Sequence, residues 1–94
     1  MEPIKFDWDE DKRLSNIKVH GLDFMDVWQL FSGDHIIGRA KPGRNGEERF
    51  LATGFIFGIY ATVIYTMRDD VARIISLRRA RRNERRDHQA LHGG

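Results

Sequence analysis

Arginines gather in one stretch near the end of this chain. The stretch reads RIISLRRARRNERR over residues 73–86, and Glu84 is the only acid between Arg78 and Arg86. Arginine suits phosphate because its planar guanidinium donates paired hydrogen bonds and stays charged. A strand-like run that leads directly into a basic helix therefore predicts a surface for phosphate.

Charge is distributed unevenly along the 94 residues. Residues 1–67 carry eight Lys or Arg and ten Asp or Glu, whereas residues 68–94 carry eight Arg and four acids. The basic C-terminal third favours an anionic partner, either nucleic acid or an acidic protein segment. A solvated, charged helix face is the alternative that charge alone leaves open.

Length and composition predict one small globular domain over residues 1–94. The chain is 40% hydrophobic with two prolines and no cysteine. The absence of cysteine excludes a disulfide scaffold and thiolate metal sites, and it fits a reducing cytoplasm. The N-terminus lacks the apolar segment of a signal peptide, so we expect a cytoplasmic protein.

An uncharged run from Phe50 to Met67 has the length of a short membrane helix. Gly54, Gly58 and three threonines interrupt it, and the remaining residues are mostly β-branched or aromatic, which suits strands. We interpret the run as a β-hairpin that turns near residues 57–58, and we expect no membrane association.

Two helices are predicted before this hairpin. Asp7 followed by Glu10 resembles a capping box, so the first helix starts there and runs to about His20, with Gly21 as its stop. Its Leu14 and Ile17 are expected in the core, and Lys12, Arg13, Asn16 and Lys18 on its polar sides. A second helix runs from Asp23 to Gly33 with an apolar stripe of Phe24, Val27, Trp28 and Phe31.

Strands are predicted over residues 34–40, 48–56, 59–67 and 71–78, with a further short strand over residues 4–8. Short turns join the last three strands into an antiparallel meander. A basic helix over residues 79–90 ends the chain. The predicted class is α+β: two N-terminal helices, a small antiparallel β-sheet and a C-terminal helix, with helices on one sheet face and the other face partly open.

Several blocks of this sequence resemble the BrnT family of type II toxins. The N-terminal block is Phe6-Asp7-Trp8-Asp9, Lys12, Asn16, His20-Gly21 and Phe24. The C-terminal block is Arg73-Ile74-Ile75-Ser76, Arg78, Ala80 and Glu84-Arg85, and Phe31, Glu48, Arg49 and Gly54 lie between the two blocks. The chain departs from the family where Val19 replaces a lysine and where His88 replaces an aromatic residue, commonly Tyr.

The resemblance implies a RelE-like fold and an RNA-cleaving toxin that arrests translation and growth in the bacterial cytoplasm. It also implies neutralisation by a BrnA-like antitoxin, in a complex of two toxins and two antitoxins. That complex represses its own operon, and it contacts operator DNA only through the antitoxin.

Metal-independent RNA cleavage needs a base for the 2′-hydroxyl, cations for the phosphorane and an acid for the leaving oxygen. The catalytic candidates are Arg78, Arg49, His20, Glu84 and His88. Arg78 and Arg49 are the phosphate ligands, and the two histidines are proton-transfer groups near neutral pH. A carboxylate amid arginines has a lowered pKa, so Glu84 is a poor base that orients Arg78 or Arg81.

Residues expected to bind RNA lie mainly around the arginine stretch. They are Lys12, Trp8, Arg73, Arg79, Arg81, Arg82 and Arg85. On a regular strand Arg73 has the opposite parity to Arg78, so without a bulge the two face different sides.

Structural alternatives stand beside these roles. They are a salt bridge from Arg78 to Glu84 or Glu48, a helix-capping role for His20, and core burial for Trp8. No cofactor is expected, and no metal site, because the histidines lack carboxylates at ligand spacing. The alternative function is a non-catalytic nucleic-acid-binding or protein-interaction module that uses the arginine helix.

Overall fold

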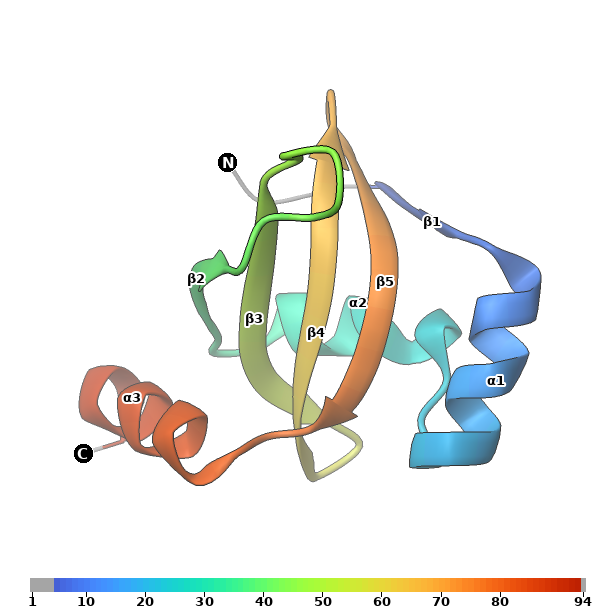
Figure 1. The fold of residues 1–94 in the computed structure, drawn as a ribbon. Coiled ribbons are helices and arrows are strands. Elements are labelled where there is room, and N and C mark those ends of the chain that lie inside the picture. Colours follow the sequence, from blue (N-terminus) through green and yellow to red (C-terminus); the bar gives the residue numbers. More distant parts are fainter. Residues whose placement is uncertain (1–4, 94) are drawn as a thin grey trace.

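A computed structural model describes residues 5–93, which form a five-stranded sheet flanked by helices (Figure 1). The predicted α+β class and the C-terminal helix are confirmed. In chain order the elements are β1 Lys5–Trp8, α1 Glu10–His20, the 3₁₀ helix η1 Phe24–Asp26, α2 Val27–Ser32, β2 Ile36–Ala40, β3 Arg49–Ile56, β4 Ile59–Arg68, β5 Val71–Arg79 and α3 Arg82–His92.

The sheet has the strand order β1-β5-β4-β3-β2. Strands β3 to β5 form the predicted antiparallel meander and β2 extends it, but β1 adds to β5 in parallel, with Lys5 opposite Val71. The prediction that the sheet is a simple meander is therefore wrong. The parallel pairing joins strands that are distant in the sequence, and local sequence patterns carry no signal for such a remote partner. Ile4, predicted in the first strand, lies outside the described residues.

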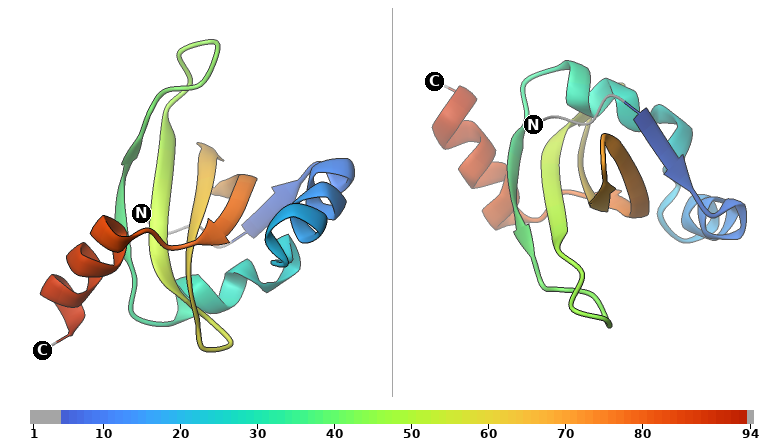
Figure 2. Two further views of the ribbon diagram at one scale, coloured as in Figure 1. Left: turned by 60° about the horizontal axis from the view of Figure 1, so that its bottom comes forward. Right: turned by 90° about the horizontal axis from the view of Figure 1, so that it is seen from above.

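One face of the sheet is the core face, and α2 packs across it. Figure 2 shows α2 on one side of the sheet and the β2–β3 loop on the other. Phe24, Val27 and Leu30 are fully buried there, whereas Trp28 is 50% exposed. The prediction for Trp28 is wrong because η1 has about three residues per turn, which changes the phase of the apolar stripe before α2 begins.

Helix α1 starts later than predicted. Its N-cap is Asp9, whose side chain accepts from the backbone N of Lys12 at 3.1 Å, while Asp7 lies in β1 opposite Arg73. Gly21 ends the helix in the left-handed conformation (φ 71°), as predicted.

The attachment of α1 to the sheet is polar. Asn16 is the buried residue of this helix, and Leu14 is 54% exposed, so both predictions for these positions are wrong. Asn16 Nδ2 donates to the carbonyl of Leu77 at 2.8 Å, and its Oδ1 accepts from the N–H of Leu77 at 3.1 Å. A buried amide that pairs with one backbone residue in this way fixes the helix against β5.

Strand β5 contains a bulge at Ile75. Ile64 pairs with Ser76 and Tyr65 pairs with Ile74, so Ile75 has no partner on β4. The extra residue shifts the alternation by one, and Ile74 and Leu77, three positions apart, both face the core. Arg73 and the residue five positions on, Arg78, consequently share the opposite face, which we call the open face. The expectation that they diverge holds only for a regular strand and is wrong here.

Helix α3 also begins later than predicted. Ala80 still donates to the carbonyl of Tyr60 at 3.0 Å, so the sheet continues into the connection and the helix starts at Arg82. Glu84 and His88 form the buried side of α3, whereas Leu91 is exposed. This side packs on β2 and β3, at one end of the open face.

Candidate functional site

A groove runs between α1 and the open face of the sheet. It consists of two hollows of about 280 and 170 Å³ that share Lys12 and Ile75 in their walls. We call it the α1 groove. Its lining residues are Asp9, Lys12, Ser15, Asn16, Val19, His20, Glu47, Arg49, Thr66, Arg68, Arg73, Ile74 and Ile75. Lysine and arginine outnumber the carboxylates four to two, so the groove favours an anion.

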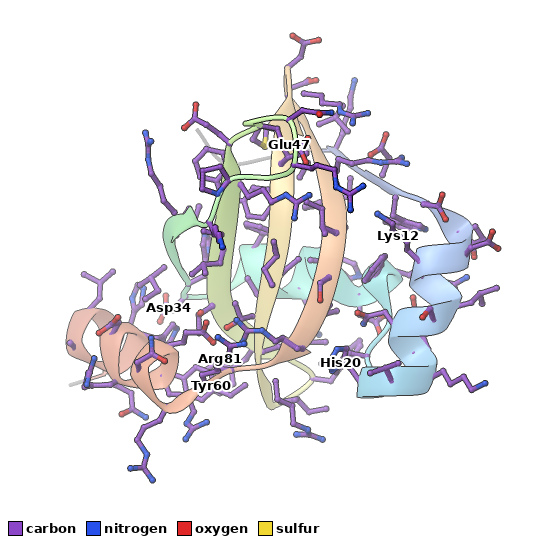
Figure 3. The ribbon with its side chains drawn as sticks, in the orientation of Figure 1. Lys12, His20, Asp34, Glu47, Tyr60 and Arg81 are labelled. Atoms are coloured by element: carbon purple, nitrogen blue, oxygen red, sulfur yellow. The ribbon has the colours of Figure 1, made fainter. Side chains whose placement is uncertain are left out.

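One stripe of α1 forms the helical wall of the groove. Lys12, Asn16 and His20 follow each other at intervals of four residues, which places them on one side of a helix. Because Asn16 is anchored to β5, the two flanking side chains lean over the sheet. Figure 3 shows Lys12 and His20 on the side of α1 that faces the strands.

The strands supply the floor and its arginines. Arg73 on β5 lies opposite Thr66 of β4 on the open face, and Arg49 begins β3 on the other side of β4. The guanidinium of Arg73 is 3.4 Å from the carboxylate of Asp7. Arg73 and Arg49 thus project into the groove from two strands, as two phosphate ligands would.

Arg78 is engaged elsewhere on the open face. Its Nη1 and Nη2 donate to the two carboxylate oxygens of Glu84, both at 2.8 Å, and the Arg78 side chain is 15% exposed. This is the salt bridge weighed as the structural alternative. It uses the terminal fork of the guanidinium and leaves the Nε edge of Arg78 for any further acceptor.

Glu84 is the centre of a buried hydrogen-bond network. Its Oε1 also accepts from Thr62 Oγ1 at 2.9 Å and from the backbone N of Arg81 at 2.8 Å. The Arg78 hydrogen bonds lower the pKa of Glu84 to about 2 against the opposing effect of burial. An ionised carboxylate with this many donors orients Arg78 and caps α3, and it is a poor proton acceptor near neutral pH.

His88 lies under α3 and does not line the α1 groove. Its Nε2 donates to the backbone oxygen of Asp34 at 2.8 Å, so its Nδ1 accepts from the hydroxyl of Tyr60 at 2.5 Å. Burial raises the pKa of that tyrosine. Both ring nitrogens of His88 therefore hold α3 against the sheet.

The remaining candidates for RNA binding divide into two groups. Trp8 packs edge-to-face on Phe24 at the core, with ring centroids 6.3 Å apart, in agreement with the core alternative. Arg79, Arg81 and Arg82 are exposed, and Arg85 Nη1 donates to the carbonyl of Ala80 at 2.8 Å. These arginines surround α3, outside the α1 groove, where they add long-range positive potential.

Sequence reasoning gave no role to several groove residues. Glu47 reaches the groove only through the fold of the β2–β3 loop, which no local pattern indicates. Arg68 was predicted in a turn, but β4 extends to it, two positions beyond Thr66 on the same face. For Asn16, the four-residue spacing from Lys12 and His20 was a signal that the sequence did contain.

Residues 5–93 contain neither a cluster of metal ligands nor a helix suited to a membrane. No group of three or more His, Cys, Asp or Glu side chains in this range is arranged to hold a metal ion. Nor does any helix in this range combine the length and apolar character needed to span a membrane.

Comparison with known families identifies a match over most of the chain. The model of a family described as "Ribonuclease toxin, BrnT, of type II toxin-antitoxin system" matches residues 8–84. The matched range includes Lys12, His20, Arg49 and Arg73. No curated protein matches the chain.

Proposed function

The chain belongs to the BrnT family of ribonuclease toxins of type II toxin–antitoxin systems, and we propose that it cleaves RNA within the α1 groove. The observation that carries this proposal is that two adjoining hollows hold His20 in one and Arg49 and Arg73 in the other, and that Lys12 lines both. These four candidates come from three different elements, and the groove combines cations with a group able to transfer protons. That combination supplies the cations and one of the two proton-transfer groups that metal-independent phosphodiester cleavage requires.

In this proposal the 2′-oxygen of RNA attacks the adjacent phosphorus while the bond from phosphorus to the 5′-oxygen breaks. Arg49 and Arg73 hold the non-bridging oxygens and offset the charge of the phosphorane. His20 performs one of the two proton transfers, because imidazole both accepts and donates protons near neutral pH, and a water molecule performs the other. Lys12 guides the RNA backbone into the groove.

Arg78, Glu84 and His88 have a supporting role in the same proposal. They fix the end of β5 and the start of α3, and Arg78 reaches substrate only through its Nε edge. The exposed arginines of α3 attract RNA from solution. A substitution at Glu84 or His88 would then act chiefly through stability rather than through the chemical step.

The cellular side of the proposal follows from the family. We infer a RelE-like fold, RNA cleavage that arrests translation and growth in the cytoplasm, and neutralisation by a BrnA-like antitoxin. The complex would contain two toxins and two antitoxins, with operator DNA bound through the antitoxin. The basic α3 supports an acidic antitoxin segment as one point of contact.

The test uses the purified chain and end-labelled RNA in the presence of EDTA. Cleavage is expected without added metal, and His20→Gln should slow it about 100-fold, within the range for removal of a proton-transfer group. His92→Gln is the matched control, because His92 is exposed on α3 outside the groove.

Two results would contradict the proposal. RNA binding without products from the folded chain would favour a nucleic-acid-binding module. If the folded chain neither binds nor cleaves RNA but binds an acidic protein partner, a protein-interaction module would be favoured.

A further inference from the structure

A carboxylate lies inside the cationic groove. The loop between β2 and β3 folds over the open face and brings Glu47 to the strands (Figures 1 and 3). Oε1 of Glu47 accepts from Arg49 Nη2 at 2.9 Å and from Arg49 Nε at 3.2 Å. Both donors on one edge of the guanidinium thus converge on one oxygen.

The loop is shaped to hold this carboxylate in place. Gly43 N donates to the carbonyl of Glu47 at 3.0 Å, and Gly46 N donates to the carbonyl of Gly43 at 2.9 Å. A Cβ added to Gly43 would lie 2.5 Å from Glu47 Oε1 and 2.7 Å from Arg49 Nε, so a side chain there would displace the pair. At the end of the loop, Thr66 Oγ1 donates to the carbonyl of Glu48 at 2.8 Å and ties the loop to β4.

The same edge of Arg49 is needed for phosphate. The Nε and Nη2 groups of arginine donate side by side to two oxygens of a phosphate or carboxylate, so one edge serves one anion at a time. Lys12, Arg68 and Arg73 line the same hollow, and an anion at Arg49 is therefore surrounded by positive charge. A substrate phosphate that binds Arg49 on this edge has to displace Glu47.

We propose that Glu47 occupies the position of a substrate phosphate at Arg49, and that its displacement sets the affinity of the groove for RNA. The identity of the anion rests on the proposed function. Glu47 is thereby a determinant of substrate binding that competes with the RNA backbone and takes no part in proton transfer.

The chain contains a matched control at the next position. Glu48 has the same charge, but its carboxylate pairs at 3.2 Å with Arg39, whose side chain is 81% exposed, and neither residue lines the groove. Glu47→Gln and Glu48→Gln change the net charge equally. A difference between them therefore reports the position of the carboxylate in the groove.

The binding experiment uses a fluorescent single-stranded 2′-O-methyl RNA, which cannot be cleaved, at several salt concentrations. Glu47→Gln should bind about threefold to tenfold tighter, as expected for removal of one partly exposed ion pair. Its plot of log K against log salt should be steeper by about 0.7, one additional phosphate contact on a single strand. Glu48→Gln should change affinity by less than about twofold with an unchanged slope.

A second variant tests the same point with both charges retained. Gly43→Ala should push Glu47 away from Arg49, and it should also tighten binding of the 2′-O-methyl RNA. Equal effects of Glu47→Gln and Glu48→Gln, or weaker binding by folded Glu47→Gln, would overturn the proposal.

Cleavage kinetics separate this inference from the proposed activity. On cleavable RNA, Glu47→Gln should lower KM and preserve kcat. A fall in kcat of about 100-fold would assign Glu47 to proton transfer instead. That result would overturn the proposal that the substrate phosphate displaces Glu47 from Arg49. If no variant cleaves RNA but Glu47→Gln still binds more tightly than Glu48→Gln, the inference stands and the proposed cleavage fails.

Discussion

Arg73 and Arg78 project from the same face of β5 although five positions separate them, because the bulge at Ile75 reverses the alternation between them. Their surroundings nevertheless differ. Arg73 enters the α1 groove, whereas Arg78 is held by Glu84 in a largely buried pair. The bulge thus leaves one arginine in the groove and the other in the attachment of α3.

Arg73→Ala should lower kcat/KM for RNA cleavage about 100-fold, the effect of losing one donor to a charged transition state. Folding stability should fall by less than about 1 kcal/mol, because the pairing with Asp7 is partly exposed. Single-turnover cleavage and urea unfolding measure the two effects. Arg39→Ala, outside the groove, is the control and should leave cleavage unchanged. A folded Arg73→Ala protein with full activity would remove Arg73 from the site.

Arg78→Ala should destabilise the fold by about 3–5 kcal/mol, because it leaves the carboxylate of Glu84 buried without its cation. The double variant Arg78→Met with Glu84→Gln should be less destabilised than Arg78→Ala alone, since no charge remains buried. Urea unfolding of Arg78→Met, Glu84→Gln and the double variant gives the coupling energy. Simple additivity would show that the two residues do not act as a pair.

Acid should weaken the fold through Glu84. Its pKa lies at about 2 in the folded protein and near 4.5 when unfolded, so the ionised folded form gives stability that is fully present above pH 4.5. That contribution is lost as the pH falls from 4.5 towards 2. Urea unfolding at a series of pH values from 7 to 2 measures the free energy of unfolding of the native chain and of Glu84→Gln. The difference between the two should shrink as the pH falls from 4.5 towards 2. A constant difference would mean that the pKa of Glu84 is not lowered.

Asn16→Ala should cost about 3 kcal/mol, because it leaves the N–H and carbonyl of Leu77 and the carbonyl of Leu22 without their side-chain partner. The amide of Leu77 should also exchange with solvent much faster. Asn83→Ala is a suitable control, since Asn83 is exposed on α3. Equal stability of these two variants would show that the hydrogen bonds of Asn16 to Leu77 do not stabilise the fold.

Features encoded by adjacent residues were predictable from the sequence. Gly21 ends α1, and Phe57 with Gly58 turns the hairpin with φ angles of 47° and 81°, both near their predicted places. The strands β3, β4 and β5 differ from their predicted ranges by a residue at one end. Alternation and turn residues are local signals, and they hold wherever the backbone stays regular.

Features that depend on remote contacts were not predictable. The burial of Asn16 requires a partner on β5, and the pairing of β1 requires the same strand, which is distant in the sequence. At the site, Lys12, His20 and Arg49 were named from residue type and family resemblance. The place of Arg73 depended on the bulge, and that of Glu47 on the shape of a loop.

The two walls of the α1 groove differ in stability, because α1 is attached to the sheet mainly by polar contacts. The sheet wall belongs to the apolar core, whereas α1 buries only Asn16 and leaves Leu14 and Val19 exposed. Such a segment opens at a lower free energy than the core does. On heating, catalysis should therefore stop at a lower temperature than the one at which the sheet melts, so the fold can outlast the activity that it supports.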